Sequence, residues 1–460
     1  MDARLAAGED PTKDPALPTL IKFGDFMAPK APTAAADIPT EVGELTDLIV
    51  RMASTVARFN TEWASQQTKL SMDLVRDLLI KVCQEGVVEE LWQSGAGNAF
   101  YRITDQGREY AQRLMEACAY IGPAPVRLDA YAAMLRWQFA ASPPTKPEHV
   151  RNALSQMILP AKSAQLAGLA ASSGRSLFVY GPSGNGKSTL GRSICSALPG
   201  DYWIPYALSV GNSVIRVFDD HCHQRVDLGE GAEVVDQRWI RIKRPLVIVG
   251  GELTLDLLDL IYSPSFKFYE APPHLKANGG VFLVDDFGRE RVSPEQLLNR
   301  FITPMEHNID YFTLRTGQKI QLPLRHVLII ATNLSPDTVT DPAFLRRMGY
   351  RLYLAPPNEE QYAKIFHAYA GKFGATVPQE MIDKILARYK EQDRELRACE
   401  PRDLIERCRD ICSFHNRPLE ISQKVLDIAW TGYFGEQGAG AVGTNKGQVS
   451  AQVPVLAETM

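Results

Sequence analysis

The chain has 460 residues, enough for two or three domains, and its 45% hydrophobic and 23% charged residues are ordinary for a globular protein rather than a fibrous or disordered one. Its 50 basic and 54 acidic residues give a net charge of −4, which excludes recruitment of nucleic acid by the charge of the whole molecule. Apolar runs of membrane-spanning length, a secretory signal and C-x-x-C cysteine pairs are all absent from the sequence, so we expect a cytoplasmic protein with reduced thiols and no integral membrane segment.

Both ends of the chain have the composition of flexible segments. Residues 1–40 are rich in Pro and Ala, and residues 434–460 are rich in Gly, Ala, Gln and Val, without a helical or strand period. We therefore predict a flexible tail at each end.

Residues 41–125 show a helical period followed by a hairpin signal. In "SMDLVRDLLIKVCQEG" the apolar residues fall on one helical face, with Ser71 as the N-cap and Gly86 as the stop. Two short strand-like runs flank the turn "SGAGN", and another helix begins near Thr104 or Asp105. This order of helix, hairpin and helix resembles a winged-helix domain.

A winged-helix domain can bind DNA, so the charges of this region matter. Between Gln66 and Cys118 the sequence has six basic and eight acidic residues, and the turn of the predicted wing carries no Lys or Arg. Contacts with DNA phosphates require cations. The sequence therefore favours protein docking or a spacer role over DNA recognition.

After a Pro-rich linker at 126–150, apolar and β-rich runs alternate with helical segments from residue 151 to residue 356. The apolar runs lie at 176–181, 245–251, 281–286, 327–333 and 350–356. Continuous apolar strands between helices predict an α/β fold with a parallel sheet covered on both faces. Ligands bind at the carboxyl ends of the strands of such sheets. A β-rich insertion is predicted near residues 203–250.

The stretch "GPSGNGKST" follows the first of these strands and precedes a helix. It matches G-x-x-x-x-G-K-[ST], in which glycines let backbone N–H groups point at phosphates in front of a helix N-terminus. Lys187 is expected to reach the β- and γ-phosphates, and the Ser188 hydroxyl to hold Mg²⁺. The predicted ATP-binding residues are Gly181, Pro182, Ser183, Gly184, Asn185, Gly186, Lys187, Ser188 and Thr189.

The stretch "GGVFLVDDFGRE", at 279–290, ends an apolar strand in two adjacent aspartates. Two like charges at the end of a buried strand need a compensating cation or exposure to water. Asp285 is predicted to bind Mg²⁺ together with Ser188, and Asp286 to polarise the attacking water. The alternative for Asp286 is a structural cap of the turn before Gly288.

Two later stretches carry further candidates. In "VLIIATNLSP", Asn333 stands at the tip of a strand, where its amide can orient water and sense the γ-phosphate. In "DPAFLRRMGYRL", Arg346 and Arg347 are candidates for arginine fingers that reach the nucleotide of a neighbouring subunit. The alternative for one of these two arginines is a surface or interface salt bridge.

Arg402 lies in the first turn of a helix in "CEPRDLIERCRD". A cation is unfavourable at that end of a helix dipole, so a bound anion such as the γ-phosphate would explain it. A salt bridge to Glu400 or Asp403 is the alternative.

In order and spacing, these motifs resemble Walker A, Walker B, sensor one, arginine finger and sensor two of the AAA+ ATPases, over residues 143–433. The resemblance implies an ATPase core at 151–356 and a helical lid at 357–433. It departs from the family at Asp286, where most relatives carry Glu. The run "YFTLRTGQKIQLP" (311–323) looks like the pre-sensor hairpin of the MoxR-like, chelatase and unfoldase branches.

A wider set of stretches resembles a bacterial family of predicted ATPases with chaperone activity that is associated with Flp pilus assembly. These stretches are "YIGPAPVRLDAY", "GRSLFVYGPSGNGKS", "KANGGVFLVDDFGRERVSPEQLLNRFITPMEH" and "DPAFLRRMGYR". The resemblance implies a ring, with six subunits expected, that hydrolyses ATP with Mg²⁺ and remodels a protein client in pilus or secretion-system assembly. The alternatives are a DNA-binding or loader ATPase that uses the winged helix, and a weakly hydrolysing scaffold.

Two stretches outside these motifs are ambiguous. His221, Cys222 and His223 suggest a metal site, but adjacent residues on a strand point to opposite faces, which argues against one. Before the Walker B strand, "YSPSFKFYEAPPHLKANGG" offers aromatic residues that could grip a substrate or belong to the core.

Overall fold

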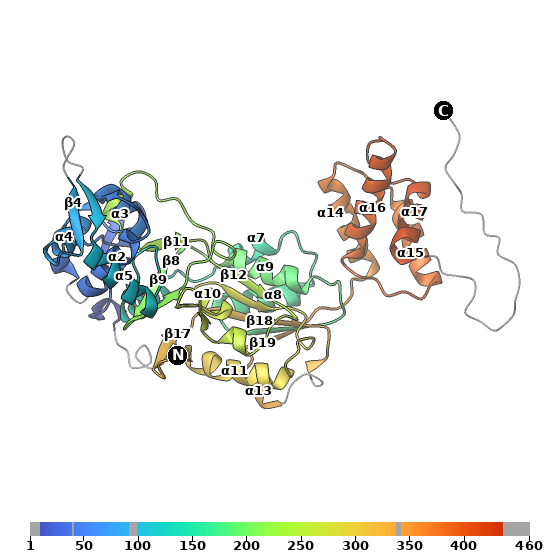
Figure 1. Ribbon diagram of the computed structural model, residues 1–460. Coiled ribbons are helices and arrows are strands. Elements are labelled where there is room, and N and C mark those ends of the chain that lie inside the picture. Colours follow the sequence, from blue (N-terminus) through green and yellow to red (C-terminus); the bar gives the residue numbers. More distant parts are fainter. Residues whose placement is uncertain (1–9, 39–40, 92–98, 337–341, 436–460) are drawn as a thin grey trace, which may run out of the picture. The chain divides into compact units, whose positions relative to one another are not determined.

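The computed structural model describes residues 10–38, 41–91, 99–336 and 342–435 (Figure 1). The chain divides into two compact units, one up to Pro356 and one from Pro357 onward, and each is described by itself. The predicted turn "SGAGN", residues 1–9 and 39–40 of the predicted N-terminal tail, and residues 436–460 of the predicted C-terminal tail lie outside the described residues. None of the described helices combines the length and the apolar composition needed to cross a membrane.

Five short strands form a parallel sheet in the first unit. They are apolar along almost their whole length, as expected for a sheet buried on both faces. From edge to edge their order is β12 (Leu246–Val249), β15 (Val281–Val284), β18 (Val327–Thr332), β7 (Leu177–Tyr180) and β19 (Tyr350–Tyr353). This sheet, with a phosphate-binding loop after β7, confirms the predicted α/β P-loop fold class.

Helices cover both faces of this sheet because alternate side chains of each strand point to opposite sides. Leu177 and Val179 of β7 pack on one face, and Phe178 between them packs on the other. The first face is covered by α7 (Pro147–Leu154), α8 (Ala161–Ser173) and α9 (Lys187–Ala197), and the second by α11 (Pro294–His307) and α13 (Pro342–Arg347).

A second β-rich region of the first unit overlaps the predicted insertion at 203–250 but has different bounds. The predicted boundaries are wrong, because residues 246–249 belong to the central sheet and the extra strands continue to residue 270. One sheet has the order β13-β14-β10-β9-β6 and another pairs β11 with β8. The bounds are β6 (Val126–Arg127), β8 (Tyr202–Pro205), β9 (Ala207–Val210), β10 (Ser213–Arg216), β11 (Trp239–Ile242), β13 (Ile261–Ser263) and β14 (Phe268–Glu270), with 3-10 turns at Ala232–Val234 and Asp256–Leu258.

The prediction of a flexible tail at 1–40 is wrong for residues 10–38. A hairpin of β1 (Leu20–Phe23) and β2 (Phe26–Pro29) packs into the core of the β-rich region, where Ala28 is fully buried. The indole N–H of Trp203 donates to the Met27 carbonyl at 3.1 Å. Only a few scattered apolar residues make these contacts, so the Pro- and Ala-rich composition hid them. Short 3-10 turns lie at Pro11–Lys13 and Ala35–Asp37.

The prediction of a linker at 126–150 is also wrong. Residues Leu128–Ala141 form α6, and Tyr131, Met134 and Leu135 of this helix are fully buried in the core of the β-rich region. Pro147 begins α7. The Pro pair before Thr145 marks a turn between two packed helices, and the helical period of α6 is obscured because it is apolar on more than one face.

The region at 41–125 contains the predicted helices and hairpin strands, and its core continues into the β-rich region through Ala207, Val214 and Phe268. Ser71 caps α4 and Thr104 caps α5, each by accepting a hydrogen bond from the backbone N–H of the third helical residue. Whether this region is a winged-helix domain stays a prediction. The elements are α2 (Val42–Ala53), β3 (Phe59–Asn60), α3 (Thr61–Thr68), α4 (Met72–Gln84), β4 (Val88–Leu91), β5 (Phe100–Ile103) and α5 (Asp105–Ala117), with sheet order β3-β5-β4.

The hairpin expected at 311–323 is β16 (Ile309–Thr313) and β17 (Lys319–Pro323), which pair antiparallel around a turn with Gly317 at φ +84°. A buried charge cluster supports its base: Asp310 accepts from Arg300 at 2.6 Å and is 2.8 Å from His274 of α10 (Pro273–Lys276). Burial raises the pKa of a carboxyl group, but these hydrogen bonds outweigh it and lower the pKa of Asp310.

The second unit is a helical bundle with its own core. Its helices are α14 (Glu359–Lys372), α15 (Gln379–Glu391), α16 (Glu400–Phe414) and α17 (Gln423–Phe434). Inside it, Tyr389 donates to the buried Glu400 carboxylate at 2.6 Å and receives a hydrogen bond from Tyr362 at 3.2 Å.

Candidate functional site

The loop between β7 and α9 is bent by three glycines in the left-handed region. Gly181, Gly184 and Gly186 have φ angles of +141°, +80° and +87°. A Cβ atom on Gly181 would lie 2.3 Å from the Leu354 carbonyl oxygen, so a larger residue cannot occupy this position without moving the end of β19. The loop therefore needs glycine both for its backbone angles and for its close approach to the neighbouring strand. Ser183 and Thr189 are partly or fully accessible at its surface, whereas Asn185 is buried.

Lys187, the first residue of α9, is the centre of the polar contacts. Its buried amino group donates to the carbonyls of Gly181 (2.8 Å) and Pro182 (2.9 Å) and to the Asn333 side chain (2.6 Å). Burial lowers the pKa of Lys187, although Asp286 and Asp285 oppose this shift. Asn333 in turn donates to the Asp286 carboxylate at 3.1 Å. The ends of β7, β15 and β18 thus meet in one hydrogen-bonded chain.

Ser188 and Asp285 lie next to this chain. The Ser188 hydroxyl donates to the Asp285 carboxylate at 2.5 Å. A hydroxyl and a carboxylate in contact suit Mg²⁺, which binds few protein oxygens and completes its shell with water and phosphate. These two predicted ligands therefore fit the ion.

Asp286 has a strained backbone, with φ +53°, and an exposed side chain. A non-glycine residue in this region costs about 1 to 3 kcal/mol unless its surroundings hold it there. The Asp286 N–H donates to the Asp285 carboxylate at 3.1 Å, and its own carboxylate meets Asn333. The carboxyl group is thereby aimed at the centre of the site.

Glu290 closes the loop after the two aspartates, a role that the sequence reasoning missed. Its carboxylate accepts from the Gly288 N–H at 2.7 Å, so this residue, rather than Asp286, caps the turn. Burial raises the pKa of Glu290, and repulsion from Asp286 adds to the shift. The signal that could have found it is an acidic residue two positions after Gly288.

Arg346 and Arg347 lie at the opposite end of the sheet from Lys187. They end α13 just before β19, whose first residue pairs with the first residue of β7, whereas the phosphate-binding loop follows the last residue of β7. Arg347 donates to Glu306 at 2.5 Å. Arg346 is exposed and forms no hydrogen bond or ion pair with the described residues. The structure does not bring either arginine to the phosphate-binding loop of its own chain.

Arg402 belongs to the second unit and is described within that unit alone. Its guanidinium contacts the Asp403 carboxylate at 2.8 Å and is largely exposed. The salt bridge considered as an alternative for Arg402 is therefore present.

The two ambiguous stretches have structural explanations. His223 accepts from the Asp219 N–H through Nδ1 (3.0 Å), so its Nε2–H donates to the Lys276 carbonyl (2.8 Å). No group of three or more His, Cys, Asp or Glu side chains suited to a metal occurs in the described part of the chain. Among the aromatic residues, Phe268 and Tyr269 are core residues, and Phe266 is 60% exposed.

Comparisons with known proteins found similarity to parts of the chain. A family model described as a domain of unknown function (DUF8689) matches residues 358–432, which are the helices of the second unit. No curated protein matches the sequence.

Solved structures with some similarity include NtrX from Brucella abortus in complex with ADP, with 13% identity and a TM-score of 0.37 over 65% of this chain and 57% of that chain. They also include a point mutant of RuvB from Thermotoga maritima, with 14% identity and a TM-score of 0.35 over 63% of this chain and 72% of that chain. The chain thus spans little more than half of the NtrX chain.

Proposed function

We propose that the chain binds ATP at residues 181–189 and hydrolyses it. The observation that supports this most is the hydrogen-bonded chain from Lys187 through Asn333 to Asp286, beside the contact of Ser188 with Asp285. These side chains come from three separate strand ends, so their meeting is a property of the fold. A basic group, an amide and two carboxylates in this arrangement suit phosphoryl transfer to water.

The contacts suggest how hydrolysis proceeds. As the β- and γ-phosphates enter the loop, the Lys187 amino group exchanges the carbonyls of Gly181 and Pro182 and the Asn333 amide oxygen for phosphate oxygens. The released Asn333 amide and the Asp286 carboxylate then hold a water in line with the γ-phosphorus. The water oxygen bonds to phosphorus, the bond to the β-phosphate oxygen breaks, and the water proton passes to Asp286. Mg²⁺, held by Ser188 and Asp285, would neutralise phosphate charge.

Arg346 completes the site on a second copy of the chain. It is exposed and stands at the end of the sheet opposite its own phosphate-binding loop, so it can act on the phosphate of a neighbour. Arg347 is the weaker candidate because Glu306 already holds it. Arg402 of the lid is proposed to reach the γ-phosphate by giving up its contact with Asp403. An arginine that acts on the nucleotide of a neighbour requires self-association of the chain. The AAA+ resemblance implies a ring, with six subunits expected.

The region at 41–125 is proposed to recruit a protein client. In its sheet, Arg102 is paired with Glu89 at 2.6 Å, which neutralises a cation that DNA binding would need. The resemblance to the Flp-associated family is the basis for expecting a cytoplasmic remodeller that acts in pilus or secretion-system assembly.

The test is ATP hydrolysis per chain measured as the protein concentration is raised. Lys187→Ala is the blank, with a loss on the order of 10³-fold expected because a positioned phosphate contact is removed. Arg346→Ala should lose on the order of 10³-fold as a finger acting between copies. Arg347→Ala is the matched control at the adjacent position, and it should change the rate by less than about tenfold.

A rate that rises with concentration and falls in the Arg346 variant supports a site shared between copies. A flat rate equal to that of the Lys187 blank, despite tight ATP binding, contradicts hydrolysis and favours the scaffold. Salt-dependent DNA binding that requires ATP would favour the loader alternative instead.

A further inference from the structure

Two adjoining cavities lie at the amino end of the central sheet, the end opposite the phosphate-binding loop. Their volumes are about 240 and 670 Å³. Their walls include Ser176, Gly280, His326 and Gly349, which stand immediately before β7, β15, β18 and β19. Shared by both cavities are Phe139, Ser173, Gly174, Asn308, Arg325 and His326.

The walls of the larger cavity are strongly basic. Arg175, Arg325, Arg346 and Arg347 line it, and none of the described residues in its walls is Asp or Glu. Arg347 has a carboxylate partner outside the walls, through its contact with Glu306. Because the whole chain carries a net charge of −4, this cluster is a local concentration of positive charge rather than a reflection of composition.

Arg244, a neighbouring arginine with a structural role, provides a comparison for the arginines of the larger cavity. Arg244, in the smaller cavity, donates to the carbonyls of Pro199 (2.6 Å) and Gly279 (2.8 Å) and to the Ser142 hydroxyl (3.2 Å). Its guanidinium group is thus hydrogen-bonded to acceptors of the protein itself. Arg175, by contrast, is exposed, and its guanidinium forms no hydrogen bond or ion pair with the described residues.

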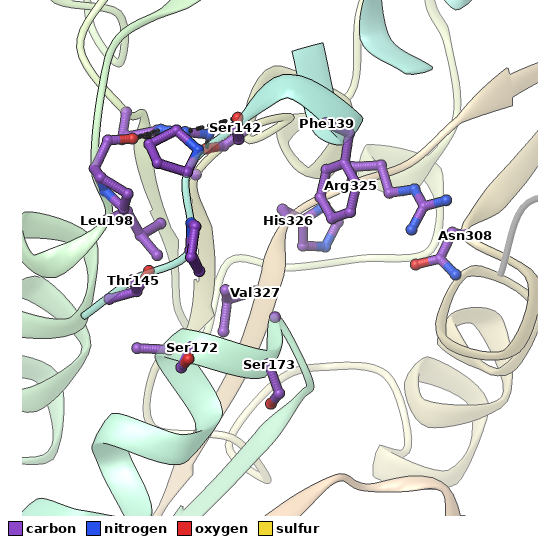
Figure 2. A pocket seen from close by; sticks show the side chains of 18 residues that line it. Phe139, Ser142, Thr145, Ser172, Ser173, Leu198, Asn308, Arg325, His326 and Val327 are labelled. Atoms are coloured by element: carbon purple, nitrogen blue, oxygen red, sulfur yellow. Dashed lines mark hydrogen bonds between the residues drawn. The ribbon is translucent and has the colours of Figure 1, made fainter. Parts of the chain in front are cut away.

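The wall also offers a flat surface and further donors. Arg325 stacks on Phe139, with 4.4 Å between the guanidinium carbon and the ring centre, and Phe139 is 42% exposed. Figure 2 shows Phe139, Arg325 and His326 grouped on one side of the smaller cavity, with Asn308 on the side toward which Arg325 extends. Nδ1 of His326 is buried and has no hydrogen-bond partner among the described residues.

These groups match one kind of ligand. Guanidinium groups, an amide and an imidazole are donors that bind phosphate oxygens, often two at a time for arginine. The exposed face of Phe139 can stack against a base. We propose that the cavity is a second binding site for polyphosphate, either inorganic or as part of a nucleotide, separate from the loop at 181–189.

A competing explanation is that the arginines only balance helix ends. α8 ends at Ser173 and α11 ends at His307, so the negative ends of two helix dipoles face this region. In that case polyphosphate would find no net attraction, and a binding experiment separates the two explanations.

The experiment uses the full chain with Lys187→Ala, which removes the lysine of the other phosphate site. Tripolyphosphate and ATP are each titrated by isothermal calorimetry, in that background alone and with Arg175→Gln or Arg325→Lys added. Arg325→Lys keeps the charge and the stacking chain, which protects the fold, but removes the forked donors. The matched control is Arg58→Gln, since Arg58 stacks on Phe100 at 5.4 Å in another part of the unit.

We expect one tripolyphosphate per chain in the Lys187→Ala background, with affinity about tenfold weaker after Arg175→Gln or Arg325→Lys and unchanged after Arg58→Gln. Tighter binding of ATP than of tripolyphosphate would identify a nucleotide as the ligand, and equal binding would identify inorganic polyphosphate. Absence of binding in the Lys187→Ala background overturns the second site, as does equal binding by all variants. Neither result bears on hydrolysis at the first site, which is measured without the Lys187 substitution.

Discussion

The two ends of the central sheet have opposite chemistry. At the carboxyl end, Asp285, Asp286 and Asn333 surround a single lysine, and each of these side chains has a partner within the group or in Ser188. At the amino end, four arginines line a cavity whose described walls include no carboxylate. The same five strands therefore present an acidic site at one end and a basic one at the other.

Helix direction accounts for part of this difference. In a parallel sheet the covering helices run against the strands, so helix N-termini gather at the carboxyl end and C-termini at the amino end. α9 begins at Lys187, and α8 ends at Ser173 on the other side. Negative groups are favoured near helix N-termini and positive groups near C-termini. The polarity of the sheet thus suits the carboxylates at its carboxyl end and the arginine cluster at its amino end.

The largest expected effect tests whether the amino end is as tightly built as the phosphate-binding loop. A Cβ atom at Gly280 would lie 1.9 Å from the Pro245 carbonyl oxygen, which also accepts from the Val281 N–H at 2.8 Å. Gly280→Ala must therefore separate β15 from β12, and we expect a loss of about 3 kcal/mol or more in the free energy of unfolding, measured with urea.

Gly43→Ala is the control, because nothing lies within 4 Å of the added Cβ in α2. It should stabilise the chain slightly, by roughly 0.5 to 1 kcal/mol. Similar midpoints for the two variants would mean that the amino end can shift without cost, and the comparison of the two ends as equally rigid would fail.

The residues of the site at the carboxyl end could be predicted from the sequence because they lie in short, continuous motifs. The loop at 181–189, the pair at Asp285 and Asp286, and Asn333 each follow an apolar run, and parallel strands bring such run ends together. Ser71 and Thr104 were readable as caps for the same local reason. What sequence alone did not give was that Lys187, Asn333 and Asp286 bond to one another.

The amino end and the β-rich region could not be predicted in this way. The cavity collects Phe139, Arg175, Arg325 and Arg346 from segments far apart in the chain, and no local pattern joins them. The N-terminal hairpin was missed because its contacts, such as that of Met27 with Trp203, are made across more than 170 residues. Composition describes a segment by itself, and these segments are ordered only by what they pack against.

A smaller effect is expected when the polar chain at the carboxyl end is cut in the middle. Asn333→Ala removes the amide that bonds both Lys187 and Asp286, so ATP hydrolysis should fall on the order of 10²-fold, with ATP affinity changed by only a few-fold. Single-turnover kinetics and nucleotide titration measure the two quantities separately. Asn299→Ala, at an exposed position of α11, is the matched control.

Equal losses of affinity and rate in the Asn333 variant would contradict a role confined to the reacting water. They would mean instead that the amide mainly holds Lys187 in the loop.

The smallest expected effect is a loss of stability at low pH, which we assign to His326 at the amino end of the sheet. Burial lowers the pKa of His326 to about 3, and the nearby His274 adds to this shift while Asp310 opposes it. An unfolded histidine has a pKa near 6.5, so the unfolded chain binds more protons below that pH, and the folded state loses stability as the pH falls through 6.5. Well above pH 6.5 the imidazole is neutral in both the folded and the unfolded state, so no stability is lost there. From pH 7.5 to pH 5.5 the loss assigned to His326 is up to about 1.4 kcal/mol.

Replacing this imidazole isolates its share of the acid loss. His326→Phe keeps an aromatic ring against Phe282, whose centre is 5.6 Å away, and removes the titrating group. Urea unfolding at the two pH values should therefore show a smaller acid loss in the variant than in the parent chain. His274 has a lowered pKa as well and remains in both proteins, so a residual loss is expected and only the difference between the two slopes reports on His326. Parallel slopes would mean that water or another group reaches the imidazole and that the amino end is less enclosed than its contacts indicate.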